Sequence, residues 1–95
     1  MLLHIVCFKY KPDTDEATRA RHLARLDAMR DLDGVVDLKV GPDVVRSPRS
    51  YDAALVVIFP DRAAHDAYQR DPVHVPVAQL GKDICDSIVV VDIGA

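Results

Sequence analysis

Two uninterrupted apolar runs constrain the fold of this chain more than any other feature of its sequence. They are Ala53 to Phe59 ("AALVVIF") and Ile88 to Val91 ("IVVV"), and both are rich in the β-branched residues that favour strands. Neither run is long enough to cross a bilayer. A strand with one wet face alternates apolar and polar side chains, whereas these runs do not alternate. The sequence therefore predicts a sheet with both faces withdrawn from water.

Breakers and periodicity divide the rest of the chain into strands and helices. Pro12 closes the first strand, and Asp13, which stands three residues before Glu16, predicts the start of a helix. Asp71-Pro72 ends a second helix, because a residue before proline disfavours the helical conformation. The predicted order is strand 2–10, helix 14–31, a strand from Val36 that ends at Gly41-Pro42, strand 51–59, helix 61–71, a short helical or irregular piece over 74–83, and strand 87–93.

This β-α-β-β-α-β order describes an α+β, ferredoxin-like protomer, in which a four-stranded antiparallel sheet carries both helices on one face. With 95 residues, we expect a single domain over 1–95. Because two helices cover one face only, the other face would leave a larger apolar patch than monomers tolerate. A second copy is the simplest cover. The sequence thus predicts a homodimer that joins its sheet faces in a dimeric α/β barrel.

Composition and charge narrow the classes of partner. The net charge is −3 with acids and bases interspersed, so we expect no basic face for nucleic acid or anionic lipid. The start "MLLHIVCF" lacks the features of a signal peptide, and we expect a cytoplasmic protein without membrane contact. Cys7 and Cys85 are expected to be buried small hydrophobes, with a mutual disulfide as the alternative.

Three residues are candidates for chemistry: His4, Tyr68 and His74. Strand alternation places His4 on one face of the first strand, and Tyr68 lies on the apolar face of the second helix. The Asp71-Pro72 break can fold His74 back toward the same space. A base with a pKa near neutrality and a phenol donor suit proton abstraction beside a carbonyl, so we expect His74 to be the base and Tyr68 to orient the carbonyl. The alternative is that these side chains only hydrogen-bond inside the core.

Other polar residues are expected to be structural. His22 should be an ordinary exposed side chain, His65 should point outward, and Asp92 should be a cap or turn former at a strand end. The chain has no Gly-rich phosphate loop, no Gly-x-Ser-x-Gly, no His-x-x-x-His and no Cys/His cluster. A metal site is therefore not expected.

Five segments in this order, "HIVCFKY", "GVVDLKVG", "YDAALVVIF", "YQRDPVH" and "SIVVVD", resemble the stress-responsive A/B barrel domain family of dimeric α+β barrels. The resemblance implies a ferredoxin-like protomer, homodimerisation through the sheets, and no metal or organic cofactor. Some members are polyketide cyclases that close a ring by an intramolecular aldol reaction. Their catalytic tyrosine and histidine match Tyr68 and His74, and their pocket histidine matches His4.

The chain departs from the plant cyclases at two positions. It has Ala53 where they carry a further histidine, and Asp71 where a histidine precedes the proline. A non-catalytic oligomer or carrier of a small hydrophobic ligand is therefore the alternative, and a cavity below about 300 Å³ would leave little room for a ligand. Related monooxygenase or haem-degrading barrels commonly use Trp or Asn, which this chain lacks. RNA-recognition domains need exposed aromatics and basic charge.

Overall fold

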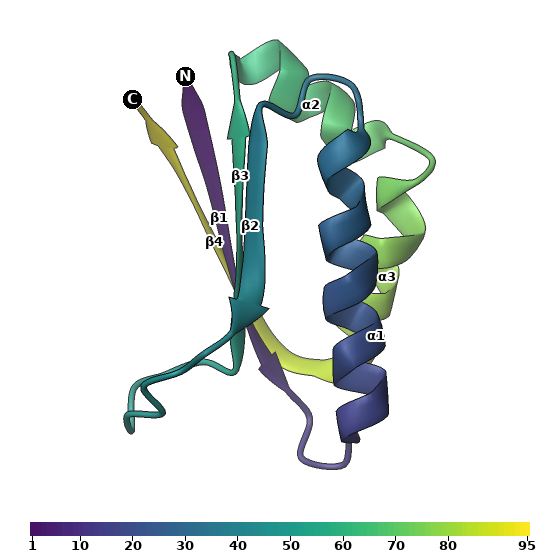
Figure 1. Cartoon of the computed structure of the whole chain (residues 1–95), viewed down its shortest axis with the longest axis vertical. Helices are drawn as coiled ribbons and strands as arrows, with labels where there is room; N and C mark the ends of the chain where they lie inside the picture. The colour runs from purple at the N-terminus through teal and green to yellow at the C-terminus, as the bar shows by residue number, and fades with distance from the viewer.

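The structure, a computed structural model, describes all residues from 1 to 95 and has a single sheet with its helices on one side (Figure 1). The elements are β1 (Leu2–Tyr10), α1 (Glu16–Asp27), a 3-10 turn η1 (Ala28–Asp31), β2 (Asp37–Pro42), β3 (Ala53–Phe59), α2 (Arg62–Arg70), α3 (His74–Ile84) and β4 (Cys85–Gly94).

The four strands are antiparallel and lie in the order β2-β3-β1-β4. β1 is central, so each of its residues has a partner on both sides: His4 lies opposite Val57 of β3 and opposite Asp92 of β4. This order, with the two long crossovers on one face, is the ferredoxin-like arrangement. The predicted fold class is confirmed.

Local capping explains where the helices begin. Asp15, and not Asp13 as expected, caps α1 by accepting a hydrogen bond of 2.8 Å from the Thr18 amide. Asp61 caps α2 in the same way, with the Ala64 amide at 2.8 Å. The segment expected to be short or irregular is an 11-residue helix, α3. It tolerates Pro76 because the proline falls in its first turn, where amides have no helical partner.

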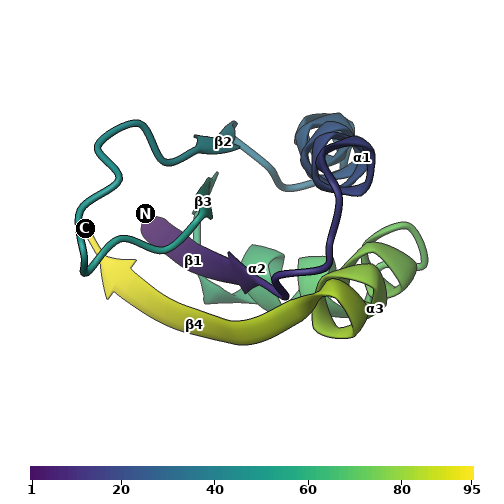
Figure 2. The same cartoon turned by 90° about the horizontal axis from the view of Figure 1, so that it is seen from below.

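The core lies between the sheet and the helices. Alternate residues of β3 are buried there, from Ala53 to Phe59, and they meet side chains of α1 and η1 such as Leu26 and Met29. Figure 2 shows α1 and α3 on the same side of the curved sheet. The alternation of buried and partly exposed positions on β3 shows that its apolar run supplies both faces.

The opposite face of the sheet carries no helix (Figures 1 and 2). Its side chains come from alternate positions of the strands, and most of them are apolar: Ile5, Val56, Val89, Val91 and Ile93. Lys9, Lys39 and Ser87 lie on the same face, toward its margins. Val91 and Ile93 of the edge strand are 58% and 45% exposed. The prediction that two helices leave one apolar face uncovered is confirmed for this chain.

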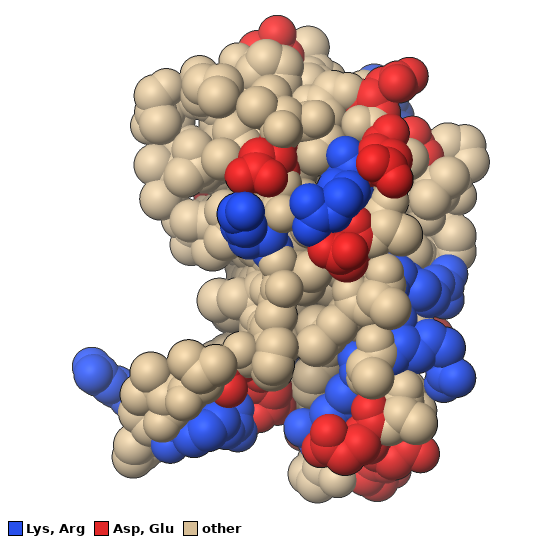
Figure 3. Space-filling model, viewed as in Figure 1, with Lys and Arg blue, Asp and Glu red and all other residues tan.

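Charges and cysteines complete the description of the surface. On the side seen in Figure 3, Lys and Arg side chains are interspersed with Asp and Glu. Cys7 and Cys85 are both free thiols; Cys85 is buried and Cys7 is partly exposed. The alternative of a mutual disulfide is therefore wrong. None of the helices combines the length and the apolar character needed to span a membrane.

Candidate functional site

A cavity of about 330 Å³ lies between the sheet and the helices, on the side of β4. Its apolar wall includes Val6, Phe8, Leu26, Val77 and Ile88. Two other lining residues, Val90 and Asp92, are exposed, so the cavity reaches the surface along the edge strand. The volume is above the limit of about 300 Å³ set for a ligand site, at the small end of the usual range.

All four histidines of the chain line this cavity: His4, His22, His65 and His74. From the sequence, only His4 and His74 of these four were expected there. No spacing in the sequence unites the four, because they come from β1, α1, α2 and α3.

The shortest polar contact in the cavity joins His4 to Asp92. The two residues face each other on adjacent strands, and His4 Nδ1 lies 2.6 Å from Asp92 Oδ1. A carboxylate only accepts, so we assign the hydrogen to Nδ1, which leaves a lone pair on Nε2. The expectation that Asp92 is a cap or turn former at a strand end is therefore wrong. The expectation failed because the register of β4 against β1 is not visible in the sequence.

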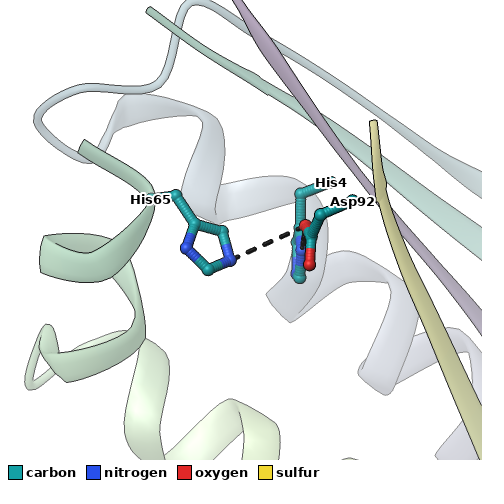
Figure 4. Close-up of side chains that lie close together, drawn as sticks. All are labelled: His4, His65 and Asp92. Atoms are coloured by element: carbon teal, nitrogen blue, oxygen red, sulfur yellow. Dashed lines mark hydrogen bonds and ion pairs between the residues drawn. The ribbon is translucent and has the colours of Figure 1, made fainter. Parts of the chain in front are cut away.

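His65 lies beside this pair (Figure 4). Its side chain is only 13% exposed, and its ring centroid is 5.1 Å from that of His4. Nδ1 is 2.9 Å from Asp66 Oδ1, and Nε2 is 3.7 Å from Asp92 Oδ1. The expectation that His65 points outward is wrong, because α2 turns the face that carries His65 and Tyr68 toward the sheet.

His74 begins α3 and also lines the cavity, as the sequence analysis expected. Its Nδ1 is buried and has no hydrogen-bond partner. Burial lowers the pKa of His74 below its usual value, and the Gln69 backbone and Asp71 oppose this only in part. The imidazole is accordingly neutral near pH 7.

Tyr68 lies behind the histidines and does not line the cavity. The residue is 1% exposed, its ring centroid is 4.3 Å from that of His74, and its hydroxyl points at Met29 Sδ, 3.9 Å away. Burial raises the pKa of the phenol, so it stays protonated. Of the three predicted site residues, the structure therefore brings His4 and His74 to the cavity and places the Tyr68 hydroxyl in the core.

His22 is fully buried, so the expectation of an exposed side chain is wrong. Its Nδ1 lies 2.8 Å from the Tyr10 hydroxyl, and its Nε2 has no partner. Burial lowers the pKa of His22 to about 4, and burial raises the pKa of Tyr10 to about 12. The signal was present in the sequence: His22, Leu26 and Met29 recur at helical spacing, and this is the buried stripe of α1 and η1.

Three side chains that line the cavity also lie close enough together to share a metal ion. His4, His65 and Asp92 each offer one donor atom, and the three atoms lie within 4.8 Å of one another. No metal site was expected from the sequence, because residues 4, 65 and 92 are brought together only by the fold.

Comparisons with solved structures agree on the fold. A dimeric ferredoxin-like protein of unknown function from Thermobifida fusca has a TM-score of 0.91 at 18% identity, over 99% of this chain and 90% of that one. A second such protein, from Jannaschia sp., has a TM-score of 0.84 at 26% identity, over 99% and 98%. Hydroxynitrile lyase from Passiflora edulis has a TM-score of 0.85 at 18% identity, over 97% and 90%.

Among curated proteins, no sequence matches this chain. The stress responsive A/B barrel domain matches residues 2–95, which is essentially the whole chain. The strand order, the uncovered apolar face and this match lead to one conclusion: the chain belongs to the stress responsive A/B barrel domain family.

Proposed function

We propose that this protein binds a small, mainly apolar carbonyl compound in the cavity and catalyses proton transfer at the carbon beside the carbonyl. The observation that supports this most is the 2.6 Å hydrogen bond between His4 Nδ1 and Asp92 Oδ1 at the wall of the 330 Å³ cavity. A carboxylate on Nδ1 fixes the imidazole tautomer and stabilises the imidazolium that forms when Nε2 takes a proton.

The assignment gives His4 the role of base. His74, which is neutral because burial lowers its pKa, is suited to donate a hydrogen bond to the carbonyl oxygen. These roles differ from those expected from the sequence, in which His74 is the base and Tyr68 orients the carbonyl. The reason is the position of the Tyr68 hydroxyl against Met29, away from the cavity.

A ring-closing aldol reaction illustrates the proposed chemistry. His4 Nε2 removes a proton from the carbon beside one carbonyl, and the enolate carbon attacks a second carbonyl carbon of the same molecule. The new alkoxide then recovers the proton from the imidazolium. One C–H bond and the π bond of the second carbonyl break, one C–C bond and one O–H bond form, and the enzyme returns to its starting state. The apolar wall of Val6, Phe8 and Ile88 suits such a ligand.

Deuterium exchange tests the proposal without a known substrate. Aryl alkyl ketones sized for the cavity are incubated in D₂O with the protein and a chelator, and loss of the signal of the hydrogens beside the carbonyl is followed by proton NMR. We expect exchange above the buffer rate that His4→Gln abolishes. The matched control is Gln79→Ala, an exposed position on α3 outside the cavity. No exchange with any ketone, or full exchange in His4→Gln, would falsify the role of His4.

A non-catalytic carrier is the second candidate. The apolar wall supports ligand binding in the absence of chemistry, since the histidines also contact one another and Asp92. A ketone that perturbs the histidine NMR signals at saturation without exchange would favour this function. A monooxygenase of similar fold has less support, because the chain has no Trp and no Asn.

We also propose that two copies pair through their uncovered sheet faces. The apolar side chains of β1, β3 and β4 on that face support this, as does the description of the Thermobifida fusca and Jannaschia relatives as dimeric. A cytoplasmic location remains a prediction from the sequence.

A further inference from the structure

The cluster of His4, His65 and Asp92 has the composition of a transition-metal site (Figure 4). Two imidazoles and one carboxylate suit Zn²⁺, Co²⁺ and related ions, whereas Mg²⁺ and Ca²⁺ prefer sites built of oxygen. The three side chains come from β1, α2 and β4, so the folded sheet and helix bring them together.

The distances between the donor atoms lie near those that one shared ion requires. Donor atoms on one tetrahedral zinc ion lie about 3.3 Å apart. Here Asp92 Oδ1 is 2.6 Å from His4 Nδ1 and 3.7 Å from His65 Nε2. Asp92 is 37% exposed at the edge of the sheet, so its side chain has room to turn between the two rings.

A second feature indicates that His65 is oriented as a ligand. Its Nδ1 donates to Asp66 Oδ1 at 2.9 Å, which leaves the Nε2 lone pair facing Asp92. Metal-binding histidines commonly donate their other N–H to a carboxylate, which fixes the tautomer and the ring orientation. Asp66 therefore occupies the place of a supporting residue outside the ligand set.

The cavity gives access to the remaining coordination position of such an ion. Three protein ligands leave a fourth tetrahedral position free, and all three side chains line the cavity. In zinc sites with three protein ligands, that position is taken by water or by a bound molecule.

We propose that His4, His65 and Asp92 bind one divalent transition-metal ion, and that the ion switches off the base formed by His4 and Asp92. Binding through Nδ1 of His4 moves its hydrogen to Nε2, so Nε2 loses the lone pair that accepts the substrate proton. The metal and the proton-transfer reaction are therefore alternatives at one site. The binding half of this proposal is independent of the proposed function; the switch rests on it.

Metal titration of the untagged full-length protein, stripped with a chelator, tests the binding half. We expect one Zn²⁺ per chain by calorimetry and visible Co²⁺ absorption bands of a tetrahedral site. His65→Gln should weaken binding at least tenfold, and Asp66→Asn, which disorients His65, should weaken it by roughly tenfold. His74→Gln is the matched control, since His74 lines the same cavity outside the cluster, and its affinity should equal that of the natural protein.

Each outcome decides a separate point. Absence of Zn²⁺ and Co²⁺ binding, or equal losses in His65→Gln and His74→Gln, overturns the metal site. Ketone exchange is measured once with chelator and once with saturating Zn²⁺ in place of the chelator. Equal exchange under the two conditions overturns the switch. Metal binding that depends on His65, with no ketone exchange in chelator, leaves the metal site standing and removes the proposed function.

Discussion

His4 and Asp92 are 88 residues apart in the sequence and 2.6 Å apart in the structure, and the pairing of β1 with β4 alone accounts for this. The two strands are antiparallel and the two residues lie directly opposite each other, so the contact depends on the register of the strands. A shift of one residue would turn Asp92 to the opposite face of the sheet and leave His4 without its carboxylate.

The first prediction concerns Asp92→Asn. The amide keeps the size of the side chain but does not stabilise an imidazolium, and it permits the wrong tautomer of His4. We expect the rate of ketone deuterium exchange to fall by about 100-fold, within the range for acid–base groups. The fold should be unchanged, because the side chain lies at the exposed edge of the sheet. Exchange within about threefold of the natural protein, measured by NMR, would contradict the role of Asp92.

The second prediction concerns Tyr68→Phe. The hydroxyl contacts only Met29 Sδ, at 3.9 Å, and sulfur is a weak acceptor. We expect ketone exchange to change by less than about threefold, whereas loss of a hydrogen bond to a reacting oxygen costs about 100-fold or more. The matched comparison is His74→Leu, which removes the proposed donor. A large loss in Tyr68→Phe with little loss in His74→Leu would restore the role expected from the family resemblance.

The fold could be predicted because each strand and helix has its own local signal. Continuous apolar runs mark β3 and β4, and the break before Pro72 separates α2 from α3. The start of α1 was misplaced by two residues, because Asp13 and Asp15 both offer a capping carboxylate. Only the structure shows that Asp15 is the one that accepts a hydrogen bond, from the Thr18 amide. The uncovered face could be predicted because the apolar runs supply two apolar faces of the sheet, and two helices cover only one of them.

The site could be predicted only in part. His4 and His74 were found because a histidine stands out in an apolar strand and after a helix break. His22 and His65 were missed because charged neighbours on their helices suggested a solvated face, although the helices turn these positions inward. The Asp92 contact depends on the pairing of the first strand with the last, which no local pattern reports.

The third prediction concerns the uncovered sheet face. Val91→Asp places a charge on β4 within the proposed dimer interface, opposite Ile5 of β1, where burial of an unpaired carboxylate is costly. We expect the variant to sediment as a monomer at concentrations where the natural protein is dimeric. Val75→Asp is the control, because Val75 is similarly exposed, at 52% against 58%, but lies on α3. Equal sedimentation of all three proteins would show that the sheet face is not the interface.

The last prediction concerns the buried histidine of α1. Burial lowers the pKa of His22 from 6.5 to about 4, so between these pH values the unfolded chain binds a proton that the folded chain does not. The stabilisation linked to neutral His22 is therefore complete above pH 6.5 and is lost as the pH falls toward 4. At 1.4 kcal/mol per pKa unit, the loss is on the order of 2–3 kcal/mol.

His22→Gln isolates this effect, since glutamine keeps an acceptor for the Tyr10 hydroxyl and does not titrate. Denaturant unfolding at pH 6.5 and at pH 4, at one protein concentration, gives the free energy of unfolding of both proteins. Other titrating groups act equally in the two chains and cancel in the comparison. We expect the natural protein to lose about 2–3 kcal/mol more than the variant on acidification. Parallel losses would mean that His22 keeps an ordinary pKa, and that water or a ligand reaches its Nε2 in solution.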